Sequence, residues 1–297
     1  MSAAARMVRE AARSRTAYLF ILPQVLGFLV FGIYPLIGTI RLSLTNWGGL
    51  GPMAFVGWRN YAALWADAVF WRSFTNTVLY ASYYVLPCLA VSLGVALLLN
   101  LRIPGMSFFR GAYYIPTVTS LVVAAFIWNW MFDFNVGLFN QYLAKIGISP
   151  LPWLLSPAMA LPSLAFMSVW KNAGYTILIY LAALQNIPEE YIESARLDGA
   201  SGWQTIRHIT IPLLNHTTLL VVVMLTIWAF QMFVQPYMMT QGGPAYATTS
   251  LVYYLYNQGF SSFRMGYASA IAVVLTATVL AVSIVQNRLL NRLTTDA

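Results

Sequence analysis

The chain has 297 residues, of which 60% are hydrophobic and only 8% are charged, whereas soluble domains carry roughly 25% charged residues. Its formal net charge is +8, with 2 His and 1 Cys. A single cysteine excludes an internal disulfide, and so few His and Cys leave no usual zinc site or catalytic triad. The composition predicts a membrane protein.

The first predicted element is a transmembrane helix over 16–38, which follows four arginines in the N-terminal segment 1–15. These arginines could also introduce a secretory signal peptide. A cleavable signal has an apolar core of about 7–15 residues and small residues at its exit. Here the uncharged run is longer and ends at Thr39-Ile40-Arg41, so we expect an uncleaved anchor.

Five further segments are apolar enough and long enough to cross a bilayer, which takes about 20 residues. They predict helices over 75–99, 111–131, 160–184, 213–235 and 266–287. The sequence therefore predicts an all-α, polytopic membrane protein with six transmembrane helices. No Asp or Glu lies well inside a predicted span, which disfavours a proton-driven transporter with buried carboxylates.

Lys171 is the one charge inside a predicted span, where an ionisable group costs at least ~2.5 kcal/mol. Two interpretations stay open. In the first, the helix begins later than position 160 and the lysine extends to the membrane interface. In the second, Lys171 lines a water-filled substrate pathway together with Asn172 and Tyr175.

The fifth predicted span carries polar and aromatic residues with the same ambiguity. Gln231 and Gln235 could line the pathway or serve helix packing. Phe230 could stack on a sugar ring, although aromatic residues are common near membrane interfaces and that explanation is the simpler one.

Residues 185–212 form a polar segment between two predicted spans, so lipid contact does not explain their polarity. The segment holds four of the chain's eight carboxylates, which are Glu189, Glu190, Glu193 and Asp198. Pro212 closes this segment or opens the next span. No metal-binding pattern accompanies the carboxylates.

Capping signals in this segment predict two short helices. Asn186 followed by Glu189 reads as a capping box, and Ser201 with Gln204 repeats that pattern. Between them, Gly199 offers a left-handed stop to the first helix. A bent helix pair on one membrane face is typical of a docking surface.

Counting Lys and Arg orients the chain. With the N-terminus inside, the segments 1–15, 100–110, 185–212 and 288–297 hold ten of them, and the segments on the other side hold five. We therefore expect both termini and the acidic loop in the cytoplasm. This distribution also accounts for most of the net positive charge, so we expect no nucleic-acid partner.

The spacing inside the loop carries a family resemblance. In order it reads Glu193-Ser194-Ala195, three residues, Gly199, nine residues, and then Ile209, Ile211 and Pro212. This resembles the EAA loop of ABC importer permeases, whose pattern is E-A-A-x3-G-x9-I-x-L-P. The segment from Gln241 to Phe260 also resembles one that these permeases carry before their last span. The resemblance extends over 72–292. Within this family, the sequence around the loop is most similar to the permeases of the carbohydrate-uptake branch.

The resemblance implies a type I ABC importer permease fold, with 72–292 as the transmembrane domain. It implies import of a sugar, oligosaccharide or related polyol across the cytoplasmic membrane of a prokaryote. The implied partners are a second homologous permease, two copies of an ABC ATPase and an extracytoplasmic solute-binding protein. The implied ATPase-coupling residues are Glu190, Glu193, Ser194, Ala195, Asp198, Gly199, Ala200, Ile209 and Pro212.

We expect no cofactor on this chain itself. Its only lysines follow Ala144 and Trp170, so it has no Gly-Lys-Ser/Thr phosphate loop. ATP and Mg are therefore expected on the partner ATPase, and the chain is not expected to be an enzyme.

Two other classes of protein stay open. A stand-alone secondary transporter or channel for a small polar solute would leave the spacing from Glu193 to Gly199 unexplained. An integral membrane enzyme should show paired carboxylates at an interface, whereas the external candidates Asp67 and Asp133 are unpaired in sequence.

Overall fold

The computed structural model describes residues 15–101 and 104–295. The all-α prediction is confirmed for this part of the chain, which contains no strand and only an isolated bridge between Thr45 and Phe55. Of the predicted N-terminal segment 1–15, all but the last residue lies outside the described residues. The chain forms two compact units. The first consists of the chain up to Leu64 together with Gln258–Val273, and the second consists of Trp65–Asn257 together with the chain from Val274 onward.

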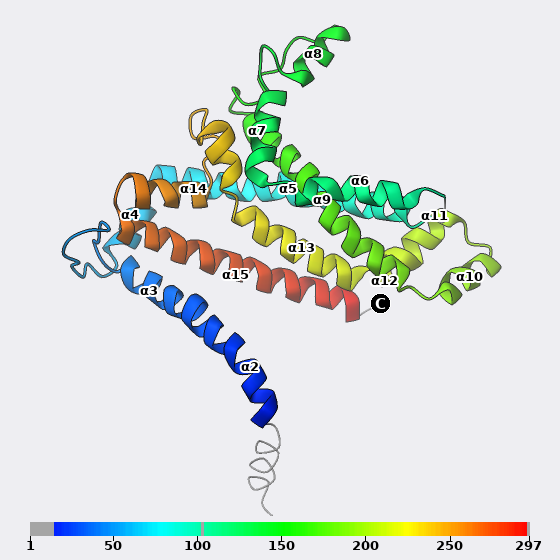
Figure 1. Ribbon diagram of the computed structural model, residues 1–297, viewed down its shortest axis with the longest axis horizontal. Helices are drawn as coiled ribbons and strands as arrows, with labels where there is room; N and C mark the ends of the chain where they lie inside the picture. Colours follow the sequence, from blue (N-terminus) through cyan, green and yellow to red (C-terminus); the bar gives the residue numbers. More distant parts are fainter. Residues whose placement is uncertain (1–14, 102–103, 296–297) are drawn as a thin grey trace, which may run out of the picture. The chain divides into compact units, whose positions relative to one another are not determined.

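The first unit contains the predicted N-terminal span. One apolar helix runs over Tyr18–Ser43, built from α2 (Arg15–Phe28), the π-turn Leu29–Ile33 and α3 (Tyr34–Ser43) (Figure 1). It continues beyond the predicted end at 38 to Ser43, where its end has a partner: the Asn60 amide, at the start of α4 (Arg59–Trp65), donates to the carbonyl oxygen of Ser43 and to that of Thr45 just beyond the helix, each at 2.8 Å.

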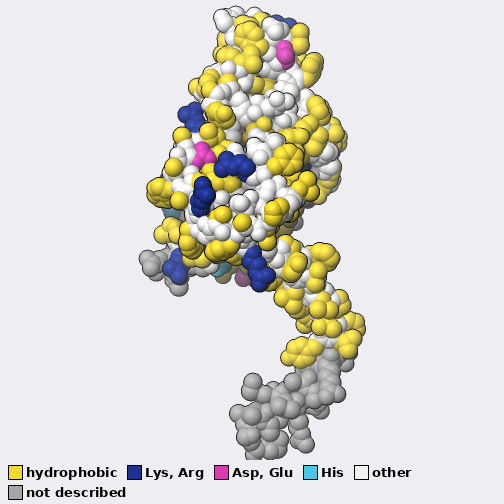
Figure 2. Space-filling view, turned by 90° about the vertical axis from the view of Figure 1, so that its left-hand side faces the viewer, with side chains coloured by type: hydrophobic (Ala, Val, Ile, Leu, Met, Phe, Trp, Pro, Cys, Tyr) yellow, Lys and Arg dark blue, Asp and Glu magenta, His cyan; other side chains and the backbone are white. Residues whose placement is uncertain are grey.

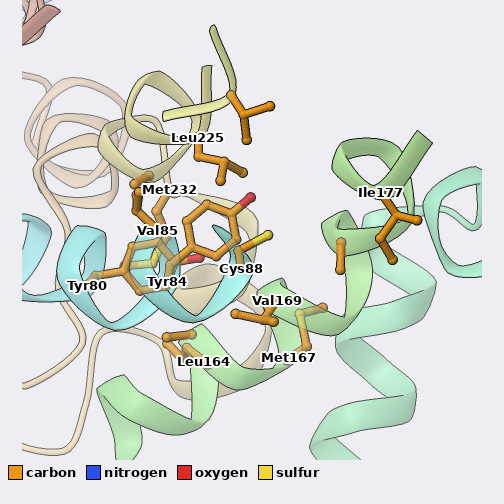
Figure 3. Packing of buried hydrophobic residues seen from close by; sticks show 14 of the residues in the cluster. Tyr80, Tyr84, Val85, Cys88, Leu164, Met167, Val169, Ile177, Leu225 and Met232 are labelled. Atoms are coloured by element: carbon orange, nitrogen blue, oxygen red, sulfur yellow. The ribbon is translucent and has the colours of Figure 1, made fainter. Parts of the chain in front are cut away.

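The second unit is built around two long helices that pack along each other, α5 (Ala68–Leu99) and α9 (Ala160–Gln185). Their polar contacts advance together by one turn: Tyr80 bonds Ser168, Tyr84 bonds Asn172, and Cys88 lies near Thr176. Each pair is separated by the same 88 residues, so the two helices run in the same direction in register. Figure 3 shows Tyr80, Tyr84 and Cys88 among the apolar side chains of this core.

The remaining elements of the second unit are α6 (Met106–Val118), α7 (Leu121–Met131), α8 (Leu138–Lys145), α10 (Glu189–Leu197), α11 (Gly202–Thr205), the π-turn Ile206–Thr210, α12 (Ile211–Leu213), α13 (Asn215–Phe230), the π-turn Pro236–Thr240 and α14 (Leu251–Tyr256). Among these elements, α6, α7, α13 and α14 pack on the pair of α5 and α9, and the others extend from them. A last π-turn, Asn257–Ser261, and α15 (Met265–Thr295) complete the described chain. In Figure 1, α10 and α11 lie at the end of this unit that is remote from α14.

Two predicted spans are broken in the structure. The third consists of α6 and α7, which are bent by 97° at Thr119 and Ser120. The fifth begins only at Asn215, after a bend of 66° that follows α12. Three described helices are long and apolar enough to cross a membrane, and the number reaches five if each bent pair is one span. The fourth predicted span is α9, whose polar side chains lower its apolar character.

The surface is dominated by apolar side chains. Figure 2 shows them spread over the visible face between other side chains and backbone, with few charged side chains among them. Exposed apolar area of this extent suits contact with lipid or with another membrane subunit.

Candidate functional site

The acidic loop begins with α10, which starts two residues later than its sequence suggests. The predicted cap at Asn186 is wrong, since that side chain donates to the Ala182 carbonyl of the preceding helix at 2.9 Å. Ile187 precedes a proline and is therefore disfavoured in helical geometry. Pro188 takes the cap position instead. Glu189 and Glu190 then lie in the first turn, where negative charge favours the helix.

The end of α10 is a Schellman motif, which confirms the predicted stop at Gly199. This glycine has φ +80°, in the left-handed region. The Ala200 amide donates to the Ala195 carbonyl at 2.9 Å, and the Gly199 amide donates to the Arg196 carbonyl at 3.1 Å. These two bonds are the pair that define the motif. The motif therefore turns the chain sharply between α10 and α11.

The second predicted cap is also confirmed. The Ser201 amide donates to Gln204 Oε1 at 2.7 Å, and the Gln204 amide donates back to Ser201 Oγ at 3.4 Å, closing a capping box. Helix α11 then continues through the π-turn that contains Ile209 into α12, where Pro212 lies just before the 66° bend. Both residues thus belong to the arm that joins the loop to α13.

The surface of this loop combines exposed charge with exposed apolar groups. Glu190, Glu193, Ser194 and Asp198 are exposed, while Ala195 packs inward. Beside them Leu197 is 89% exposed and Trp203 is 67% exposed. We find no ion pair between Glu193 and any residue in the described ranges. A helix pair that leaves an apolar rim and unpaired carboxylates uncovered is suited to docking a partner with basic groups.

A cleft of about 780 Å³ adjoins this surface. It lies between the end of α5, the start of α6 and α10, and both Glu193 and Arg196 line it together with Arg110. The exposed surface of α10 is therefore bordered by a cleft, so the loop presents a defined shape to a partner.

The residues predicted for a substrate pathway fall into two groups. Asn172 and Gln231 line the same open hollow of about 250 Å³, together with Trp228 and Gln235. Tyr175 lies next to it, with its ring 5.7 Å from that of Trp228. Phe230 is 4% exposed, belongs to the packed interior and does not line this hollow.

Lys171 also lies away from the hollow, and the structure gives it an environment that neither interpretation of the sequence included. Its side chain is 7% exposed, and Nζ donates to the Thr117 carbonyl oxygen at 2.8 Å. Thr117 is in the last turn of α6, where carbonyl groups lack helical partners and a cation is favourable. A Cβ at the neighbouring Gly174 would overlap the Tyr113 carbonyl oxygen, so α9 meets α6 at close range here. Lys171 therefore fastens the end of α6 at its break.

Sequence reasoning did not identify Tyr80, Tyr84 and Ser168 as functional candidates, yet their hydroxyl groups hold the amides of the hollow. Asn172 Nδ2 donates to the Tyr84 hydroxyl at 2.8 Å, and Gln235 Nε2 donates to Ser168 Oγ at 3.0 Å. The available signal was polar residues recurring every four positions along two otherwise apolar helices.

The apolar helices and the broken spans define a membrane permease. Residues 91–295 match the family described as "Binding-protein-dependent transport system inner membrane component", and the chain belongs to this family.

Similar proteins agree with this membership. The chain is 37% identical over 274 residues to the probable ABC transporter permease protein YurN of Bacillus subtilis, covering 91% of this chain and 94% of that protein. It is 35% identical over 275 residues to the arabinooligosaccharides transport system permease protein AraP of Bacillus subtilis, covering 92% and 87%. It is 36% identical over 276 residues to the trehalose/maltose transport system permease protein MalF of Thermococcus litoralis, covering 92% of each.

Among solved structures, a chain of a bacterial alginate ABC transporter, in complex with an alginate pentasaccharide-bound periplasmic protein, superposes with a TM-score of 0.85. The two chains are 24% identical, and the match covers 97% of this chain and 98% of that one. This likeness shows the fold, which is that of a type I ABC importer permease. The predicted family and the predicted all-α permease fold are confirmed, while the number of six spans stays a prediction.

Proposed function

We propose that this permease carries a sugar, oligosaccharide or related polyol into the cell, driven by ATP that a separate subunit hydrolyses. Relatives are named as permeases for arabinooligosaccharides, trehalose or maltose, and lactose. The working assembly contains a second homologous permease, two copies of the ABC ATPase and an extracytoplasmic solute-binding protein. ATP and Mg bind to the ATPase and no cofactor binds to this chain. The chain crosses the cytoplasmic membrane with both termini in the cytoplasm.

The observation that carries the proposal is the uncovered loop at the end of α9. Its two caps fix the shape of α10 and α11 without a partner, and Glu190, Glu193, Leu197 and Trp203 point their side chains to the surface of the described structure. The residues that dock the ATPase are Glu190, Glu193, Ser194, Ala195, Asp198, Gly199, Ala200, Ile209 and Pro212. Ala195 is buried on the inner face of α10, so it supports the docking surface and does not contact the ATPase itself.

For the substrate pathway we propose the hollow lined by Asn172 and Gln231, with Tyr175 at its edge. Lys171 and Phe230 belong to the wall behind this path and hold its shape, since neither lines the hollow. Rocking of the two permeases as the ATPases close would expose the path to one side of the membrane and then to the other.

The test is purification of the tagged permease in mild detergent, followed by reconstitution in liposomes with the subunits that accompany it. We expect an ATPase to follow the permease and sugar uptake to require ATP and the solute-binding protein. Uptake driven by an ion gradient alone, with no ATPase retained, would instead establish the secondary transporter.

A further inference from the structure

The hydrogen bonds behind the hollow point to the chemical class of its ligand. Resting on the proposed function, we infer that Gln235 determines specificity: its carbonyl oxygen selects a neutral, hydroxyl-bearing sugar and disfavours an acidic one, such as a uronate or a sulfonate. Gln235 is 6% exposed, lines the hollow and follows the end of α13.

The orientation of the Gln235 amide follows from the protons available around it. Ser168 Oγ donates its one proton to the Leu164 carbonyl at 2.9 Å, and the Tyr80 hydroxyl donates its own to Ser168 Oγ at 2.7 Å. Both hydroxyl groups can then only accept from Gln235. Its Nε2 accordingly donates to Ser168 Oγ at 3.0 Å and to the Tyr80 hydroxyl at 3.4 Å.

This arrangement leaves Gln235 Oε1 for the ligand. Within the described ranges, two polar side-chain atoms are fully buried and have no hydrogen-bond partner, namely Arg110 Nε and Gln286 Oε1. The Gln235 oxygen is not among them and accepts no hydrogen bond from the described residues, so it is not fully sealed, and we assign its free face to the hollow that Gln235 lines. A turned amide would place this oxygen against two oxygens that have no proton left to give.

The other groups of the hollow agree with a neutral ligand. Asn172 Nδ2 donates to the Tyr84 hydroxyl, so the side-chain carbonyl oxygen of Asn172 also remains for the ligand. Trp228 and Gln231 add neutral donors at the exposed side, and Leu121 brings the first turn of α7. None of the described residues that line the hollow is charged.

A hydroxyl group satisfies such a wall because it donates to the carbonyl oxygens and accepts from the N–H groups. A carboxylate or sulfonate only accepts. It would face the Gln235 oxygen with no proton to offer and would lose water without gaining a cation, since the ammonium of Lys171 is bonded to Thr117. The substrate class is therefore a neutral sugar.

The experiment compares ligand binding by the intact, detergent-purified permease–ATPase complex without the solute-binding protein, because that protein has a selectivity of its own. The probes are maltose, trehalose and lactose, against uronic acid disaccharides of the same length. We expect the best neutral probe to bind roughly tenfold to a hundredfold more tightly than the best acidic one, as expected where a buried acceptor would go unpaired.

Ser168→Ala tests the role of Gln235. Without Ser168 Oγ, the proton of the Tyr80 hydroxyl becomes free to bond the Gln235 carbonyl, so the amide turns and offers its NH2 to the ligand. We expect the preference for neutral probes to shrink by about tenfold. The matched control is Ser163→Ala, which removes a buried serine of the same helix that bonds the Trp153 carbonyl instead and should leave the preference unchanged.

Retention of the ATPase in every variant separates the two proposals. Equal or tighter binding of acidic probes by the wild-type complex, or the same preference in Ser168→Ala as in Ser163→Ala, would overturn the assignment of Gln235 and leave the importer intact. Failure of the wild-type permease to retain an ATPase would overturn the importer proposal, and the substrate class with it. Gln231→Lys adds a cation at the exposed side, and improved binding of acidic probes in that variant is the expected sign that the assay reports on the hollow.

Discussion

Gly199 allows the docking role of the loop to be separated from its folding. The residue has φ +80°, and a Cβ built there meets no atom within 4 Å. A substitution therefore costs backbone strain and causes no collision within the permease. For alanine the left-handed conformation costs about 1–2 kcal/mol, while asparagine tolerates it better. Each 1.4 kcal/mol changes an equilibrium constant tenfold. Alanine should therefore reduce the population of the correctly shaped loop by roughly 5-fold to 30-fold.

The measurement is the affinity of the ATPase for affinity-purified permease, determined by titrating the ATPase and measuring the amount retained. We expect Gly199→Asn to lie close to wild type and Gly199→Ala to bind more weakly by the factor above. Gly199→Trp should bind more weakly than Gly199→Ala, because its ring projects into space that is empty in the permease alone. Any loss beyond that of alanine reports the surface of the partner.

Gly202 supplies the matched control. It lies in the same loop, is also free of neighbours within 4 Å, and has no positive φ. Gly202→Ala should therefore leave the affinity unchanged or slightly improved, since alanine favours the helix that begins there. Undiminished ATPase retention and uptake in Gly199→Trp would refute both the coupling assignment and the reasoning from shape.

The remaining predictions concern charge, the helix break and topology. Glu193→Lys should weaken ATPase retention at least tenfold by placing like charges at the contact, and Glu193→Gln should have an intermediate effect, measured by the same titration. Lys171→Met removes a charged hydrogen bond to Thr117 worth about 1.5–3 kcal/mol. The maximal uptake rate should therefore fall while the KM for sugar stays unchanged. A raised KM alone would indicate that Lys171 contacts the substrate instead. With the native cysteine removed, a cysteine at the exposed Ser201 should resist an impermeant thiol reagent added outside, and one at Tyr246, which is 58% exposed, should react. The reverse labelling would overturn the orientation.

Features encoded by neighbouring residues could be predicted from the sequence. The caps of the acidic loop depend on groups three to five residues apart, so Gly199 and the pair of Ser201 and Gln204 were visible in the pattern. The failure at Asn186 has an equally local cause, because Pro188 keeps the preceding residue out of a helix. The long apolar helices follow from composition alone.

Features that depend on distant residues could not be predicted. The partner of Lys171 is Thr117, which is 54 residues earlier in the chain and reaches it only because α6 ends there. Likewise, the bonds that orient Gln235 come from Tyr80, 155 residues away, and Ser168, 67 residues away. Hydropathy identifies a lone polar group in a span but not the group that satisfies it, which is set by the register between helices.

The connection between loop and hollow follows from chain order. Helix α9 carries Asn172 in the hollow and leads, through Gln185, into α10; α13 emerges from the other end of the loop and leads to Gln231. The loop thus joins two helices that lead to the hollow, and the Tyr180 hydroxyl of α9 donates to Thr218 Oγ1 of α13 at 3.2 Å. Asn172 and Gln185 lie about 20 Å apart along an unbroken helix at 1.5 Å per residue. Because a packed helix moves as a rigid body, a displacement that a docked partner passes to the Gln185 end of α9 would reach Asn172 without a hinge inside that helix.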